Sequence, residues 1–176
     1  MGIYDRGENG IVKVSHAVYR RVVEEPNVVM IKDSSMDPER RKLALEARRR
    51  RPGLTLLNGD EFHCVDDLEA GYDELLLGGG VFNGYLAAQI MKAATEGDLP
   101  QAERLQAQMN RIMFAVCGGR KITCWLSGEK KLLVEMGLLT SWRNYPNYPL
   151  TPSCCRAIRG VLKTEREALF PYRRNP

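Results

Sequence analysis

Short apolar blocks and longer amphipathic stretches alternate along the first half of the chain. Apolar runs cover residues 3–4, 28–31, 54–57 and 75–77. A continuous run, rather than an alternating one, is typical of a parallel strand that is covered on both faces. The pattern therefore predicts an α/β fold with four buried parallel strands. Lys32 follows the second run and is expected at the carboxyl end of that strand.

Helix signals separate these strands. Ser15 is a candidate N-cap for a helix that ends before Pro26, and Asp37 followed by Pro38 is a typical helix start. Beyond residue 80 the strand pattern stops, and glycines mark the expected ends of helices at about 83–95, 100–116, 122–136 and 153–169. We therefore expect a β/α segment over residues 1–96 and a helical region over residues 97–176.

Composition indicates a globular protein. Hydrophobic residues make up 44% of the chain and charged residues 27%, with a net charge of +4. No stretch has the roughly 18 consecutive apolar residues of a membrane span, and the N-terminus lacks the apolar core of a signal peptide. The five cysteines are odd in number and contain no C-x-x-C pair, which favours reduced thiols. These features predict a cytoplasmic protein with no membrane partner.

Two further patterns suggest other functions. His63 and Cys64 are candidate zinc ligands, but the spacing of the other cysteines does not suit a zinc site. Residues 48–51 are four consecutive arginines, without the interleaved aromatic residues or the known motif of a nucleic-acid surface. The same arginines suit the C-terminus of a helix. We therefore expect neither a metal nor a nucleic acid as partner.

Lys32 is the strongest candidate for chemistry. The carboxyl ends of parallel strands are where α/β folds place their active sites. Partial desolvation of a lysine disfavours its ammonium form, and the free amine can attack a carbonyl carbon to form a Schiff base. The alternative is a lysine that ends a strand with its head group in water.

The residues around Lys32 carry a family resemblance. Residues 28–37, VVMIKDSSMD, resemble the Schiff-base lysine segment of the N-acetylneuraminate lyase and dihydrodipicolinate synthase family. Residues 56–61 and 71–80 resemble the ends of that family's seventh and eighth strands, and residues 4–156 follow its order. These proteins are pyruvate-dependent class I aldolases on a (β/α)8 TIM barrel. The resemblance implies the C-terminal half of that barrel, about four parallel strands, followed by a helical appendix.

The resemblance also implies a site. Lys32 would form the imine and Tyr4 would relay a proton, with a tyrosine packed on the core as the alternative for Tyr4. The implied substrate is a small 2-oxo acid such as pyruvate, or a 2-oxo-3-deoxy sugar acid, with no cofactor and no metal. The implied substrate-binding residues are Asn58, Asp60, Gly78, Gly79, Gly80 and Asn83. The glycines are equally compatible with a plain turn, and Asp60 with capping the next helix.

The chain departs from the family in several places. Asp5-Arg6-Gly7 lacks the proline that usually follows the catalytic tyrosine, and Met36 stands where glycine is common. The chain has 176 residues, whereas a (β/α)8 barrel needs about 250. The hydroxyl-rich segment that grips the pyruvate carboxylate in the family has no counterpart here. We therefore expect an activity weakened by truncation.

Two functions follow as hypotheses. The first is a lysine-dependent lyase of this family. The second is a non-catalytic half-barrel that associates with itself or with a full-length relative. Both predict an oligomer, because a half-barrel sheet leaves open edges and an uncovered face.

Overall fold

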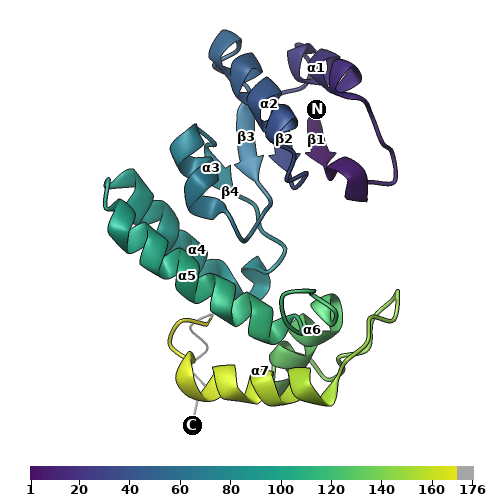
Figure 1. Cartoon of the computed structure of the whole chain (residues 1–176), viewed down its shortest axis with the longest axis vertical. Helices are drawn as coiled ribbons and strands as arrows, with labels where there is room; N and C mark the ends of the chain where they lie inside the picture. Colours follow the sequence, from purple (N-terminus) through teal and green to yellow (C-terminus); the bar gives the residue numbers. More distant parts are fainter. Residues whose placement is uncertain (170–176) are drawn as a thin grey trace. The chain divides into compact units, whose positions relative to one another are not determined.

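The structure is a computed structural model that describes residues 1–169 (Figure 1). Its sheet consists of β1 (Gly2–Asp5), β2 (Met30–Asp33), β3 (Thr55–Asn58) and β4 (Glu74–Leu75). The strands lie in this order, and every neighbouring pair is parallel. The predicted α/β fold with four parallel strands is confirmed. The second and fourth strands differ in position from the apolar runs at 28–31 and 75–77, because β2 extends to Asp33 and β4 begins at Glu74.

A helix follows each of the four strands. The helical elements are η1 (Gly7–Asn9), α1 (His16–Glu24), α2 (Pro38–Arg50), α3 (Cys64–Ala70), α4 (Gly80–Thr95), α5 (Leu99–Val116), α6 (Trp125–Glu135) and α7 (Pro152–Thr164). Three predicted boundaries are wrong. The helix expected from residue 83 begins at Gly80. The helix expected from residue 122 begins at Trp125, because Ile122 has φ 51° and a left-handed residue cannot belong to an α-helix. The last helix was expected to reach residue 169 and ends at Thr164.

The described residues form two compact units. The first contains residues 1–78 and 90–102, and the second contains residues 79–89 and the described chain from Glu103 onward. Helices α4 and α5 each contribute to both units. The predicted division at residue 96 separates the β/α segment from the helical region rather than two compact units. It stays a prediction.

Local signals start the two helices that cover the sheet. The Ser15 hydroxyl accepts a hydrogen bond from the backbone N–H of Val18 at 3.3 Å and so caps α1. The Asp37 carboxylate accepts one from the N–H of Glu39 at 2.9 Å, and Pro38 occupies the first turn of α2. Both caps satisfy donors that a helix N-terminus otherwise leaves unpaired, as the sequence predicted.

The core of the first unit lies between the sheet and helices α1 and α2, which are seen beside β1 to β3 in Figure 1. Its members are apolar or aromatic residues that are almost wholly buried: Tyr19, Val23, Val28, Ile31, Leu43, Ala44, Ala47, Leu54, Leu56 and Tyr72. The expectation that the second strand is covered on both faces is wrong. Met30 is 37% exposed, on the face of the sheet opposite these helices, as expected for the uncovered face of a half-barrel. Val29, which is 51% exposed, precedes the strand.

Three of the four arginines at residues 48–51 connect elements of this unit. Arg48 makes two hydrogen bonds to the Asp73 carboxylate, at 2.9 and 2.6 Å. Arg51 donates to the backbone carbonyl of Val28 at 2.6 Å, and Arg50 pairs with Glu24 at 2.9 Å. These guanidinium groups therefore bind the end of α2 to its neighbours.

A buried ion pair joins β1 to α2. The Arg40 guanidinium donates to the Asp5 carboxylate at 2.7 Å and to the carbonyl of Val14 at 2.6 Å. The Arg40 side chain is 3% exposed and that of Asp5 is 9% exposed. Because both charges are removed from water, each depends on the other for compensation.

Replacing Arg40 by alanine should destabilise the protein by about 3–5 kcal/mol, because the buried Asp5 carboxylate would lose its cation. Urea unfolding followed by circular dichroism measures this loss. The control is Arg49→Ala, which removes an exposed arginine from the same helix and should change stability by at most about 0.5 kcal/mol. Equal effects of the two substitutions would contradict the structural role of the pair.

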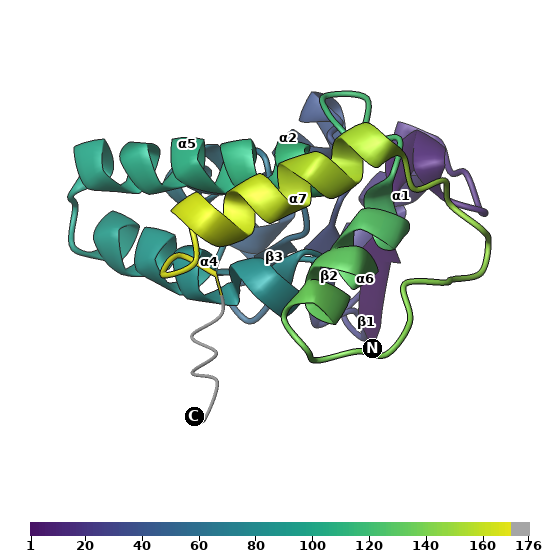
Figure 2. The same cartoon turned by 90° about the horizontal axis from the view of Figure 1, so that it is seen from below.

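In the second unit, α6 and α7 lie side by side (Figure 2). Leu132 of α6 and Ile158 of α7 are fully buried. Gly128 lets α6 approach α5 closely, because a Cβ atom at this position would lie 1.8 Å from the carbonyl oxygen of Val116. Among residues 1–169, no helix is long and apolar enough to cross a membrane.

Candidate functional site

The same short turn closes the carboxyl end of three neighbouring strands. The side-chain oxygen of Asp5 accepts a hydrogen bond from the backbone N–H of Gly7 at 3.0 Å. Asp33 accepts one from the N–H of Ser35 at 2.8 Å, and Asn58 accepts one from the N–H of Asp60. These are Asx turns, in which an Asp or Asn bonds its own backbone two residues further on. They fix where the chain leaves each strand.

These turn residues lie in register with one another. Asp5 pairs with Asp33, and Asp33 with Asn58. Successive side chains of a strand point to opposite faces, so the residue before each turn residue faces away from the helices. Those residues are Tyr4, Lys32 and Leu57, which are also in register. The predicted imine lysine therefore lies on the open face of the sheet.

The structure brings Lys32 and Tyr4 together. The Lys32 Nζ atom lies over the Tyr4 ring, 4.5 Å from its centroid. Lys32 is half-buried and Tyr4 is 56% exposed. The contact joins the amine to the face of the aromatic ring, so it places a side chain that bears a phenol next to the candidate nucleophile. The alternative reading of Tyr4 as a core tyrosine does not fit this exposure.

Asp33 supports the chain next to Lys32 from the helix side. Its carboxylate accepts a hydrogen bond from the Tyr72 hydroxyl at 2.6 Å, and both residues are buried. Burial raises the pKa of Tyr72 far above its ordinary value, and the neighbouring Asp33 charge raises it further. The phenol is therefore protonated at neutral pH and donates to the Asp33 carboxylate.

Asn58 and Asp60 occupy the end of β3. The Asn58 side chain is fully buried, and its amide also donates to the carbonyl of Asp60 at 2.9 Å. It thus lies on the opposite face of the sheet from Lys32. The Asp60 carboxylate binds His63 Nδ1 at 2.7 Å. This hydrogen bond raises the pKa of His63 above its ordinary value.

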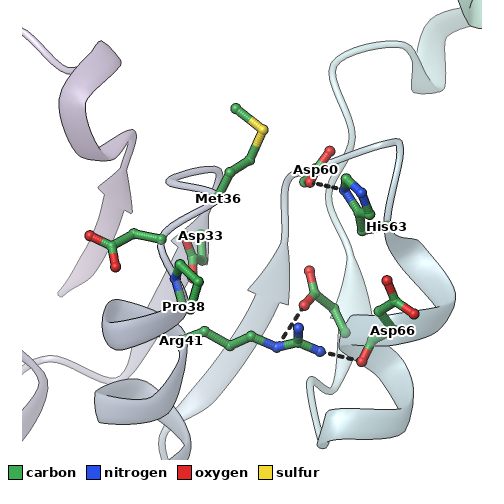
Figure 3. A pocket seen from close by; sticks show the side chains of 9 residues that line it. Asp33, Met36, Pro38, Arg41, Asp60, His63 and Asp66 are labelled. Carbon is green, nitrogen blue, oxygen red and sulfur yellow. Dashed lines mark hydrogen bonds and ion pairs between the residues drawn. The ribbon is translucent and has the colours of Figure 1, made fainter.

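A pocket of about 210 Å³ opens between the strand ends and helices α2 and α3 (Figure 3). It is lined mainly by acidic residues, together with a histidine, an arginine and two apolar side chains: Asp33, Met36, Asp37, Pro38, Arg41, Asp60, His63, Asp66 and Asp67. Of the residues predicted for the site, only Asp60 lines it. Arg41 crosses the pocket and pairs with Asp67 at 3.0 Å. No group of three or more His, Cys, Asp or Glu residues within 1–169 is arranged to hold a metal ion.

Met36 has a backbone conformation that usually requires glycine. Its φ angle is 54°, in the left-handed region, and its side chain is 64% exposed beside the pocket. A side chain in this conformation costs roughly 1–2 kcal/mol. The glycine expected at this position by resemblance therefore has a physical reason.

The predicted glycines stand at the start of α4. Gly78 belongs to the first unit, where a Cβ atom on it would lie 3.3 Å from a carboxylate oxygen of Glu61. Gly79 and Gly80 belong to the second unit, and the carbonyl of Gly79 accepts hydrogen bonds from the N–H groups of Phe82 and Asn83. These contacts begin a helix.

Asn83 is fully buried in the second unit, yet neither polar atom of its amide has a hydrogen-bond partner among the described residues. A buried amide without partners is rare, because its desolvation is uncompensated. Its predicted role in substrate binding stays a prediction.

The fold and this arrangement define a class of protein. Four parallel strands, each followed by a helix, form part of a (β/α)8 barrel, with a lysine and a tyrosine side by side at the carboxyl edge. A model of the dihydrodipicolinate synthetase family matches residues 1–163. The chain belongs to this family, as the resemblance implied.

Solved structures of dihydrodipicolinate synthases and of an N-acetylneuraminate lyase share the fold. Dihydrodipicolinate synthase from Bacteroides thetaiotaomicron is 22% identical, with a TM-score of 0.75 over 92% of this chain and 55% of that one. The enzyme from Thermotoga maritima is 19% identical, with a TM-score of 0.77 over 96% and 56%. N-acetylneuraminate lyase from Fusobacterium nucleatum is 17% identical, with a TM-score of 0.72 over 93% and 54%. The chain thus spans little more than half the length of these structures. No curated protein matches it.

Sequence reasoning missed two residues near Lys32. Tyr72 was part of a matching segment, but its bond to Asp33 spans 39 residues and no local pattern indicates it. Gly59 lies within the segment 56–61 that resembles the family, but its own role was not predicted. Its backbone N–H donates to the carbonyl of Asp33 at 2.7 Å. Its position after an asparagine at a strand end was the available signal.

The buried Asp67 should make stability depend on pH. Burial raises the pKa of Asp67 to about 6, against the opposing effect of Arg41. A carboxyl whose pKa is raised on folding adds stability below its unfolded pKa, and this stability is lost as the pH rises through 6. The difference in unfolding free energy between wild type and Asp67→Asn should therefore fall by about 3 kcal/mol from pH 4 to pH 8.

Chemical denaturation at several pH values measures this difference. The matched control is Glu69→Gln, because Glu69 is an exposed carboxylate on the same helix. This variant should keep the pH dependence of the wild type. A difference between wild type and Asp67→Asn that stays constant with pH would contradict the prediction.

Proposed function

We propose that the protein acts as a class I aldolase or lyase, in which Lys32 forms a Schiff base with pyruvate or a 2-oxo-3-deoxy sugar acid. The observation that carries the proposal is the Lys32 Nζ atom beside the Tyr4 ring, at the carboxyl edge of a sheet in a chain of this family. The chain is proposed to work in the cytoplasm, without a cofactor.

The reaction follows from these two side chains. The Lys32 ammonium must lose a proton before its nitrogen attacks the ketone carbon of the substrate. The resulting carbinolamine loses water to give an iminium at C2 of the sugar acid. The iminium accepts the electron pair of the C3–C4 bond as that bond breaks, and so becomes an enamine. Tyr4 is proposed to take the proton from the hydroxyl group that becomes the aldehyde.

The proposed substrate contacts are Asp60, Gly78, Gly79, Gly80, Asn58 and Asn83. Backbone N–H groups in the glycine segment can approach a carboxylate closely. Asn58 would contribute indirectly, because its buried amide holds the turn that carries Asp60. Substrate orientation can contribute about 7–11 kcal/mol to a reaction barrier. Much of that contribution is expected from the barrel half that this chain does not match.

Borohydride trapping tests the imine. Incubation with pyruvate and borohydride should reduce the imine to a stable secondary amine on Lys32, detected by peptide mass spectrometry. Lys32→Ala should abolish the adduct. Lys42→Ala is the matched control, because Lys42 is an exposed lysine on α2 and its removal should leave the yield unchanged. Label spread evenly over surface lysines would refute the proposal.

A second candidate function is assembly. The open face of the sheet carries the partly exposed Tyr4 and Met30, and β1 and β4 are edge strands. Exposed edges and apolar faces favour pairing with another chain. A non-catalytic half-barrel would use this face to bind a copy of itself or a longer relative.

Sedimentation over a wide concentration range tests this candidate. The protein should self-associate at micromolar concentration, and Met30→Glu should weaken association at least about tenfold, since it places a charge in an apolar contact. Val18→Glu is the control, because Val18 is 42% exposed on α1, away from the open face. A monomer at every concentration would exclude self-assembly.

A further inference from the structure

Gly59 touches the stem of the candidate nucleophile. A Cβ atom built on Gly59 would lie 2.7 Å from Lys32 Cε, 2.1 Å from Ser34 Oγ and 3.1 Å from the carbonyl oxygen of Asp33. Real side chains do not approach so closely, so the first two atoms would have to move. The last methylene group of Lys32 therefore occupies space that exists only because residue 59 has no side chain.

Lys32 is held from two sides. Its Cε atom lies against Gly59, and its Nζ atom lies over the Tyr4 ring at 4.5 Å. The Ser34 hydroxyl donates to the Gly59 carbonyl at 3.0 Å, and the Gly59 N–H donates to the Asp33 carbonyl at 2.7 Å. These bonds fix Gly59 relative to the strand that carries the lysine.

We propose that Gly59 is a positioning residue for Lys32: the space above its Cα directs the lysine stem towards Tyr4. The inference deepens the proposed function and rests on it for its catalytic meaning. Gly59 touches no reacting atom, since it acts only through the path of the Lys32 side chain.

The effect of a side chain here falls on placement more than on stability. The two overlapped atoms, Lys32 Cε and Ser34 Oγ, are near the ends of side chains that can rotate. Gly59 also lies outside the left-handed region, so alanine fits its backbone. Gly59→Ala should leave the fold intact and displace the amine. A displacement of about 1 Å can slow a reaction about 10²-fold.

Ser34 must be separated from Lys32 in the test. Ser34→Ala removes the hydroxyl group that the new methyl would meet at 2.1 Å. In the double variant Gly59→Ala/Ser34→Ala, the overlap with Lys32 Cε remains. Comparing the double variant with Ser34→Ala therefore isolates the lysine. Gly53→Ala is the matched control, because Gly53 is exposed and a Cβ there meets nothing within 4 Å.

The first measurement is the rate of imine trapping with pyruvate and borohydride. The double variant should react about 100-fold more slowly than Ser34→Ala, with an unchanged circular dichroism spectrum and melting midpoint. Gly53→Ala should react like the wild type. Equal rates for the double variant and Ser34→Ala would overturn the inference if Lys32 is trapped in both.

The second measurement needs no reaction with substrate. Lysines are methylated reductively with ¹³C-formaldehyde, and the Lys32 signal is assigned by its loss in Lys32→Ala. In the wild type the Tyr4 ring current should shift this signal, and Tyr4→Leu should remove the shift. The double variant should lose the shift, whereas Ser34→Ala and Gly53→Ala should keep it.

The two measurements separate the two proposals. A shift that is lost in the double variant, in a protein whose wild type traps no pyruvate, would support the positioning of Lys32 and refute the lyase. Trapping in the wild type together with a shift that survives in the double variant would support the lyase and overturn the role of Gly59.

Discussion

The geometry of the candidate site depends on hydrogen bonds made by three buried side chains on the face of the sheet opposite Lys32. Asp5, Asp33 and Asn58 end successive strands, and each bonds the backbone N–H two residues further on. A buried carboxylate or amide is costly unless it is paired. Each of these side chains therefore holds the loop that follows its strand in one conformation. Side chains alternate along a strand. Because Asp5 and Asp33 face the helices, Tyr4 and Lys32 face the open side of the sheet.

Each buried group at these strand ends is compensated differently. Asp5 has the guanidinium of Arg40 at 2.7 Å, whereas Asp33 has the neutral hydroxyl of Tyr72 at 2.6 Å. Asn58 is uncharged, and its side chain bonds to the turn that follows it. The carboxylate of Asp33, next to Lys32 in β2, thus receives its hydrogen bond from the phenol of Tyr72. The Arg40 guanidinium pairs instead with Asp5 of the neighbouring strand β1.

Local chemistry made much of this fold predictable. The caps at Ser15 and Asp37 act within three residues, and the order of apolar runs was enough to predict four parallel strands. The family resemblance, not the apolar pattern, put Tyr4 in one site with Lys32. The open face of the sheet was expected from the half-barrel that the family resemblance implied. The apolar runs alone did not indicate it, because a continuous run looks the same whether one face or both are covered.

Longer-range contacts escaped prediction for a related reason. The hydrogen bond from Tyr72 to Asp33 joins residues far apart in the chain, and the close approach of Gly59 to Lys32 depends on how two strand ends meet. The left-handed backbone of Ile122 could not be predicted from its residue type, since β-branched residues rarely adopt this conformation. Its conformation delayed the start of α6 by three residues from the expected position.

The locked strand register constrains how this sequence can vary over evolution. A one-residue insertion or deletion inside β2 would exchange the faces occupied by Lys32 and Asp33. An insertion before Lys32 would carry the amine into the buried layer beside Tyr72, whereas a deletion there would bring the Asp33 carboxylate next to Tyr4. Substitutions can accumulate in this strand one at a time, but changes of length cannot. Length variation among descendants of this chain should therefore concentrate in the loops before β2 and beyond the Asx turn.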